Sequence, residues 1–269
     1  MIVEIAYLAR RDLKKFWKSK FAVISTLIRP LSWLVLFGLA FNPAKIAGES
    51  TTSSNLSQTL GGAPDYFSFI AVGMLSIMVL QLSLRGMSSI VIDKYMGFMD
   101  KVMVAPIRRE TMLLSKIAST AVRGVLQALV MLIVALPLGM NLGGNFGIIK
   151  LLGVVAVLVV LSISLSGFFI SIGSVVKRFE TQEAVASALA LPIMFTSNVL
   201  YPTKIMPFWL QPIALINPIT YSTSIIRYLL YTPSLNPGSL VFDTAVLALL
   251  LGASIAVVYI STAITTARR

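Results

Sequence analysis

Long apolar runs separated by short polar or charged stretches make up most of this chain. An apolar run of about 20 residues is long enough for a helix to cross the hydrocarbon core of a membrane. The pattern therefore predicts an all-α, polytopic membrane protein with six spans in a single transmembrane domain, residues 1–269. The expected spans are approximately residues 21–41, 66–84, 111–140, 148–176, 183–200 and 240–262.

The N-terminal segment, residues 1–20, follows a different pattern. Apolar residues such as Ile5, Leu8 and Phe16 are interspersed with five basic residues between Arg10 and Lys18. A basic amphipathic helix of this kind lies along a membrane interface. We therefore predict an interfacial helix over residues 1–20. It lacks the small-residue cleavage site of a secretory leader.

Two further segments interrupt the apolar pattern. Residues 85–116 form a charged amphipathic stretch that we expect to lie in water, with residues 85–110 as a cytoplasmic segment between spans two and three. Residues 201–238 contain six prolines, which break a spanning helix. This second segment predicts short external or re-entrant helices before the last span.

The distribution of Lys and Arg predicts the orientation, because cytoplasmic loops are enriched in these residues. Sixteen of the 22 basic residues fall on one side of the predicted layout. Four fall on the other side: Lys45, Lys150, Lys204 and Arg227. Both termini are therefore expected to be cytoplasmic.

Composition narrows the possible functions. Hydrophobic residues make up 57% of the chain and charged residues 12%, and there is no Cys and no His. Disulfides, imidazole bases and the usual zinc ligands are thus excluded, and we expect no metal, cofactor or catalytic site in this chain. The net charge is +12, and the basic residues lie beside the apolar spans. This position favours contact with an anionic membrane face over binding of nucleic acid.

The energy source must lie outside this chain or in an ion gradient, since no G-x-x-x-x-G-K-[ST] phosphate loop occurs. Gradient-driven carriers usually place an ionisable residue at membrane depth. Every Asp and Glu here lies outside an expected span or near its end. A partner ATPase is therefore favoured, and a gradient-driven secondary carrier is the alternative.

Two stretches carry a family resemblance. The first is Asp93-Lys94-Tyr95-Met96-Gly97-Phe98-Met99-Asp100-Lys101, followed by Pro106-Ile107-Arg108-Arg109. The second is Pro207-Phe208-Trp209-Leu210-Gln211, followed by Asn217-Pro218-Ile219-Thr220-Tyr221 and Arg227. Together with the six-span layout, they resemble the ABC-2 type permeases that export drugs, lipids or polysaccharides, including those of daunorubicin resistance. The first stretch departs from the commonest family pattern, because Phe98-Met99-Asp100 replaces Thr-x-Glu.

The resemblance implies a permease that is not itself an enzyme. Two copies of the permease would form a homodimer in the cell membrane of a prokaryote. This homodimer would associate with two ATPase subunits, which bind ATP and Mg. The substrate would be amphipathic or hydrophobic: a drug, a lipid or a glycan. The residues implied to couple to the ATPase are Asp93, Lys94, Gly97, Asp100, Lys101, Arg108 and Arg109. A second ATPase contact would involve Lys177, Arg178 and Glu180, and an outer gate would involve Trp209, Asn217, Pro218 and Tyr221.

Three alternatives remain open on the sequence. The segment 85–116 could rest on anionic lipid instead of an ATPase. Asn217 could be only a turn-former, because it precedes a proline. The small residues of the fourth span, from Ser162 to Ser174, could serve helix packing or line a pathway.

Overall fold

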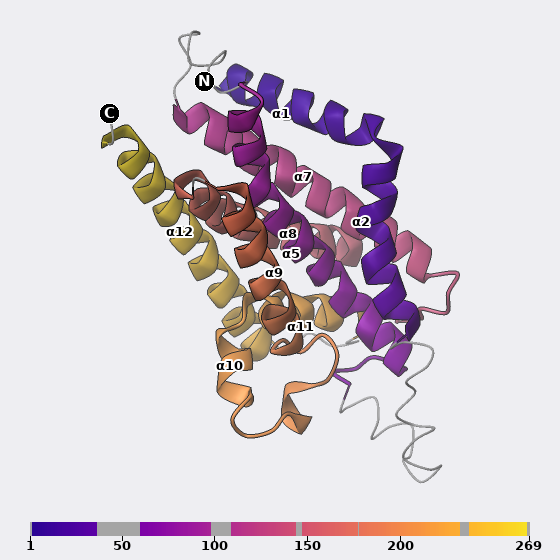
Figure 1. Ribbon diagram of the computed structural model, residues 1–269. Helices are drawn as coiled ribbons and strands as arrows, with labels where there is room; N and C mark the ends of the chain where they lie inside the picture. Colours follow the sequence, from indigo (N-terminus) through magenta and orange to yellow (C-terminus); the bar gives the residue numbers. More distant parts are fainter. Residues whose placement is uncertain are drawn as a thin grey trace.

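The computed structural model describes residues 2–36, 60–97, 109–143, 147–176, 178–231 and 237–267. Every element in these ranges is helical, which confirms the all-α prediction (Figure 1). In chain order they are α1 (Ile2–Lys18), α2 (Lys20–Trp33), α5 (Tyr66–Tyr95), α7 (Arg109–Ala135), α8 (Ile148–Val175), α9 (Phe179–Phe195), the 3₁₀ turn η2 (Thr203–Ile205), α10 (Gln211–Ile216), α11 (Pro218–Tyr231) and α12 (Pro237–Ala267).

Four helices are long and apolar enough to cross a membrane: α5, α7, α8 and α12. They match the predicted second, third, fourth and sixth spans. Helices α1 and α2 form a pair bent by 83° that could supply one more, which gives up to five spans. The predicted fifth span corresponds to the 17-residue α9, and residues 37–41 of the first lie outside the described ranges. The six-span count therefore stays a prediction.

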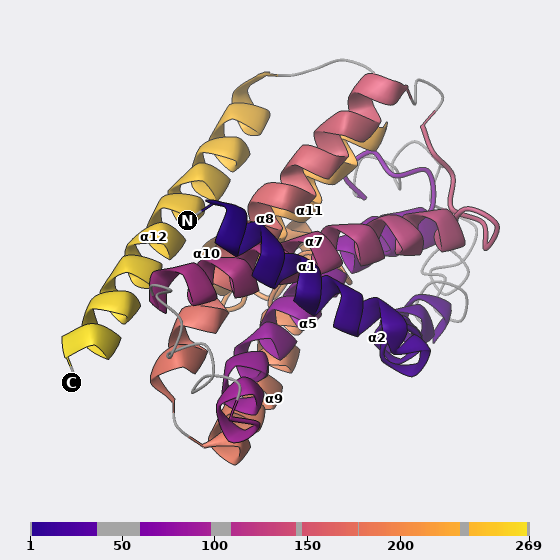
Figure 2. The ribbon, with the colours of Figure 1, turned by 90° about the horizontal axis from the view of Figure 1, so that it is seen from above.

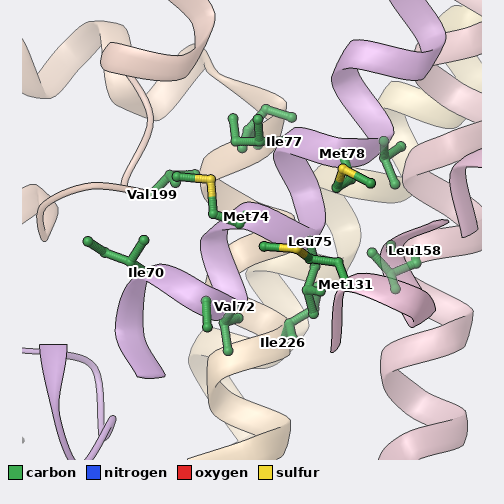
Figure 3. Close-up of a cluster of buried hydrophobic side chains, with 14 of the residues drawn as sticks. Ile70, Val72, Met74, Leu75, Ile77, Met78, Met131, Leu158, Val199 and Ile226 are labelled. Atoms are coloured by element: carbon green, nitrogen blue, oxygen red, sulfur yellow. The ribbon is translucent and has the colours of Figure 1, made fainter. Parts of the chain in front are cut away.

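Helix α5 lies at the centre of the bundle. Its most apolar window is 94% buried, whereas the corresponding window of α12 is 11% buried. A helix that is apolar around its whole circumference must be covered on all sides. Figure 3 shows how this cover is built: Met131 of α7, Leu158 of α8 and Ile226 of α11 lie around the α5 side chains Met74 and Leu75.

Local signals define both ends of α5. Asp65 caps the start, because the backbone N–H of Ser68 donates to its Oδ1 at 2.7 Å. The sequence predicted that this span ends near Leu84. The helix instead continues to Tyr95. Met87, Ile90 and Val91 are buried, so the first part of the predicted 85–110 segment is packed in the protein instead of lying in water. The helix is followed by Gly97, whose φ of +64° suits only glycine without strain.

Small residues allow the helices to approach closely. Ser162 of α8 packs against Gly124 of α7, Gly173 of α8 against Met87 of α5, and Gly167 of α8 against Ser254 on α12. Close approach through small side chains is the usual basis of helix packing in membranes. The small residues of α8 thus serve packing within the chain.

Helix α1 crosses one end of the bundle, where it contacts α7 (Figure 2). The C-terminal end of α12 lies at this same end, and α10 lies at the opposite end (Figure 1). This arrangement agrees with termini that share one side of the membrane. That this side is cytoplasmic stays a prediction.

The tight contact at Gly173 can be tested with Gly252 as a matched control. A methyl group on Gly173 would lie 2.6 Å from both Cγ and the carbonyl oxygen of Met87, whereas one on Gly252 would meet nothing within 4 Å. We expect Gly173→Ala to destabilise the fold by about 1–3 kcal/mol through overpacking. Gly252→Ala should leave stability unchanged or slightly raised. Thermal unfolding in detergent would measure both, and equal unfolding midpoints would contradict the packing shown.

Candidate functional site

A buried cluster of three charged side chains joins three helices at the end of the bundle that α1 crosses. Lys116 Nζ of α7 lies 2.8 Å from Asp12 Oδ2 of α1 and 2.5 Å from Asp93 Oδ2 of α5. All three side chains are less than one-tenth exposed. Removing such charges from water costs several kcal/mol per ion unless they are well paired. We call Asp12, Asp93 and Lys116 the charge cluster, and it fixes α1 to the ends of α5 and α7.

Helix α9 is joined to the same end of α5. Ser88 Oγ donates to Glu183 Oε1 at 3.0 Å, and Gln182 Nε2 donates to the carbonyl of Gly173 at 2.7 Å. The first bond places the start of α9 beside the last turns of α5, and the second joins it to the end of α8. The turn between α8 and α9 therefore lies at the same end as the charge cluster.

The structure separates the predicted coupling residues into three groups. Gly97 lies in the turn after α5, and no atom of the described residues comes within 4 Å of the place where a Cβ on it would lie. Asp93 is only 4% exposed and paired with Lys116, so it positions helices and does not present its carboxylate to a partner. The others have side chains outside the described residues: Lys94, Asp100, Lys101, Arg108 and Arg109.

The predicted second contact is partly described. Arg178 precedes α9 as its N-terminal cap residue and is exposed, and Glu180 is exposed in the first turn. Lys177 lies outside the described residues. Arg178 and Glu180 are thus accessible at the same end of the bundle as Gly97.

At the opposite end, Asn217 joins three helices. The backbone N–H of Ile219 donates to Asn217 Oδ1 at 3.0 Å, which caps α11. Asn217 Nδ2 donates to the carbonyl of Ile193 at 2.7 Å and to Thr196 Oγ1 at 3.0 Å, at the end of α9. Its backbone also ends α10. The structure therefore gives Asn217 the turn-forming role, and any role in a gate stays a prediction.

The other predicted gate residues differ in their surroundings. Pro218 is the first residue of α11, a position where its missing N–H is not needed. Tyr221 is buried, and its hydroxyl donates to the carbonyl of Leu215 at 2.5 Å. Trp209 is 60% exposed in the turn before α10. The structure thus groups Asn217, Pro218 and Tyr221 at the junction of α10 and α11, with Trp209 on the surface.

Arg227 falls within the segment that was predicted to form short external or re-entrant helices. It belongs to α11 and is only 4% exposed. Its guanidinium donates to the carbonyls of Asn198 (2.8 Å), Phe69 (2.9 Å) and Val199 (3.2 Å), and it stacks 3.4 Å from the centre of the Phe69 ring. The carbonyls and the ring replace water around the charge, which is why a cation can be buried there.

A model of the family described as ABC-2 type transporter matches residues 3–231 of this chain. The chain belongs to the ABC-2 type transporter family. Within this permease, the match includes both the charge cluster and the α10–α11 junction, and it ends at the last residue of α11.

Individual relatives are similar to the permease over most of its length. A protein of Cyanophora paradoxa described as a transport permease, ycf38, is 28% identical over 260 residues, which cover 96% of this chain and 85% of the relative. The daunorubicin resistance ABC transporter permease protein DrrB1 of Streptomyces coeruleorubidus is 23% identical over 209 residues, which cover 78% of this chain and 68% of the relative. A Mycobacterium tuberculosis protein described as the doxorubicin resistance ABC transporter permease protein DrrC is 24% identical over 246 residues, which cover 88% of this chain and 81% of the relative.

The charge cluster predicts a large penalty for removing its cation. Lys116→Met would leave Asp93 buried without its positive partner and Asp12 paired only with Arg11, at 3.3 Å, which should cost about 3–5 kcal/mol. The unfolding temperature of the purified permease in detergent should fall accordingly. Adding Asp12→Asn and Asp93→Asn should recover much of this loss, because neutral amides need no counter-charge.

Arg178→Met is the control for this experiment. It removes a basic residue that is exposed at the same end of the bundle. Its effect on the unfolding temperature should be small, as is usual for surface substitutions. A similar loss in Arg178→Met and Lys116→Met would contradict the cluster's role.

The two functions of the Asn217 side chain can be separated by substitution. Asn217→Asp keeps an oxygen to cap α11 but loses the two Nδ2 bonds to the end of α9, whereas Asn217→Ala loses both. We expect Asn217→Ala to lose about 1 kcal/mol from the lost cap. Asn217→Asp should lose more despite its cap, because a buried carboxylate oxygen would face the Ile193 carbonyl where Nδ2 now donates. Comparison of the two unfolding midpoints at neutral pH would test this order, and a more stable Asn217→Asp would contradict it.

Proposed function

We propose that this permease is the membrane subunit of an ATP-driven exporter that works with a separate ATPase. Membership of the ABC-2 family and the drug-resistance names of two relatives support this proposal. The charge cluster is the observation that carries it, because it ties together the helix ends on either side of segment 98–108. A push on that segment would reach three helices at once.

The coupling would be mechanical. The segment 98–108 leaves α5 at Gly97 and enters α7 at Arg109. An ATPase that binds this segment would displace both helix ends as a unit, together with α1, when it closes on ATP. Rigid-body displacement of packed helices is an established way to transmit such motions. Exposed Arg178 and Glu180, at the same end, would provide the second contact.

The assembly would contain two permease subunits and two ATPases, with ATP and Mg bound by the ATPases alone. Both termini and segment 98–108 would face the cytoplasm of a prokaryotic cell. Displacement of α5 would reach the α10–α11 junction, where Trp209, Asn217, Pro218 and Tyr221 would form the outer gate. The substrate would be an amphipathic or hydrophobic molecule moved outward, such as a drug, lipid or glycan.

A gradient-driven carrier would need an ionisable side chain available for ion binding within the membrane. Asp12 and Asp93 are instead held by Lys116. This pairing favours the ATP-driven function over the carrier.

Gly97 and Gly139 offer a matched test of coupling. Both have positive φ (+64° and +111°) and both have open space where a Cβ would lie, but Gly139 is at the opposite end of α7 from Arg109. Valine at either position should cause backbone strain of about 1–3 kcal/mol. We expect Gly97→Val to reduce export and co-purification of the ATPase sharply, while Gly139→Val leaves co-purification unchanged. ATPase pull-down and transport in vesicles would measure both effects, and equal loss in the two variants would overturn the coupling role.

Asp100→Lys distinguishes an ATPase contact from a lipid contact for the same segment. An added basic residue would strengthen binding to an anionic leaflet by about 1 kcal/mol. If the segment docks on an ATPase, co-purification should fall instead. Unchanged assembly and transport in this variant would leave the family assignment intact but remove the proposed docking residue.

A further inference from the structure

Arg227 is a buried cation that makes no ion pair with a carboxylate of the described residues. The three carbonyls and the Phe69 ring solvate it, but within the described ranges no Asp or Glu lies at ion-pair distance. Its Nε also has no hydrogen-bond partner among the described residues. Lys116, at the other end of the bundle, has two carboxylate partners. Among the described residues, the groups within hydrogen-bond distance of the Arg227 guanidinium are thus all neutral.

A cavity of about 420 Å³ borders Arg227. It lies between the start of α5, the segment after α9, α11 and the start of α12. Its volume falls within the range of small-molecule sites, about 300–1,000 Å³. Polar side chains line much of it: Asn198, Thr203, Lys204, Ser224, Arg227, Tyr228 and Asp243.

The donors around the cavity suit an anion with several oxygens. Arg227 and Lys204 bring two positive charges, and Asp243 brings one negative charge. Thr203 and Tyr228 add hydroxyl groups to the lining. Phosphate groups are commonly bound by such sets of charged and neutral donors, because each of their oxygens can accept hydrogen bonds.

Two acceptors in the same lining refine the choice of ligand. Asn198 Oδ1 is buried and has no hydrogen-bond partner among the described residues, because only the Nδ2 of this side chain is engaged, with Ser224 Oγ at 2.8 Å. A buried acceptor without a donor costs about 1–3 kcal/mol. Asp243 supplies a second acceptor. A ligand that carries a hydroxyl or ammonium group next to its phosphate would satisfy both kinds of lining.

We propose that this cavity binds a phosphate ester that also carries a hydrogen-bond donor, such as the headgroup of phosphatidylglycerol. Lys204 and the Nε of Arg227 hold the phosphate, because both Nη atoms of Arg227 already donate to backbone carbonyls. Asn198 and Asp243 accept from the donor group. The same chemistry could come from a lipid of the surrounding leaflet or from a soluble phosphate ester. The site does not depend on the direction of transport or on an ATPase partner.

The test measures binding of short-chain phosphatidylglycerol to the purified permease in detergent, with short-chain phosphatidylcholine and glycerol phosphate as comparison ligands. Phosphatidylglycerol should bind more tightly than phosphatidylcholine, whose headgroup has no hydrogen-bond donor. Binding of glycerol phosphate as well would identify a soluble ester as a competent ligand, whereas binding of the lipid alone would identify the membrane as the source. Failure to bind either phosphatidylglycerol or glycerol phosphate would overturn the site.

Two substitutions that change the charge of the cavity lining in opposite directions make the binding test specific. Neither of them alters the buried Arg227. Lys204→Gln should weaken binding about two- to five-fold, the range expected for a partly exposed charge pair. Asp243→Asn removes a like charge but keeps an acceptor oxygen, so it should strengthen binding by a similar factor. Thermal unfolding of each variant would show that the fold is retained.

Lys150→Gln is the matched control for net charge. Lys150 lies in the first turn of α8 and does not line the cavity. Its substitution should leave affinity unchanged. Equal weakening in Lys150→Gln and Lys204→Gln would show attraction to the surface as a whole and overturn the proposal. If instead Asp243→Asn weakened binding and Lys204→Gln strengthened it, the cavity would be a cation site, and this result would also overturn the proposal.

Discussion

Helix α5 is largely enclosed by protein, so most polar groups along it can be satisfied only inside the molecule. Asp65 and Ser68 satisfy each other at its start, and Ser76 is bonded to Ser222 of α11 near its middle. Ser88 and Asp93 are held by α9 and α7 near its end. The helix is about 45 Å long at 1.5 Å per residue. It therefore connects polar contacts at both ends of the bundle through an almost wholly apolar core.

Two buried cations are stabilised in different ways at these two ends. The ammonium of Lys116 is a compact charge, and two carboxylates approach it from separate helices. The guanidinium of Arg227 is flat, so it can stack on Phe69 while donating to carbonyls in the plane of the group. The first arrangement joins three helices by charge. The second fixes α11 to the backbone of its neighbours.

Much of the fold could be predicted from the sequence because hydrophobicity and turn chemistry are local signals. The four long apolar helices were predicted near their observed positions, and Asn217-Pro218 marked the start of α11. Pairing across the bundle could not be predicted in this way. Asp12 and Lys116 are more than 100 residues apart, and only the folded chain shows that they meet.

The burial of individual charged side chains could not be predicted from the sequence either. Arg227 falls in the proline-rich segment that was predicted to form external or re-entrant helices, yet it is buried, and the carbonyls that solvate it belong to Phe69, Asn198 and Val199. The end of α5 was misplaced for a related reason. Arg85 introduces charge after an apolar run, but the buried side chains beyond it continue the helix to Tyr95.

The weak enclosure of α12 has a consequence for how the protein is made. Its main contacts are with α8 and α11, both of which precede it in the chain, and the family match ends before it begins. Chains are synthesised from the N-terminus, and earlier parts can fold before later ones emerge. The central helix and its immediate neighbours are all complete by Tyr231. During biogenesis, α12 can therefore dock last onto a bundle that is already assembled.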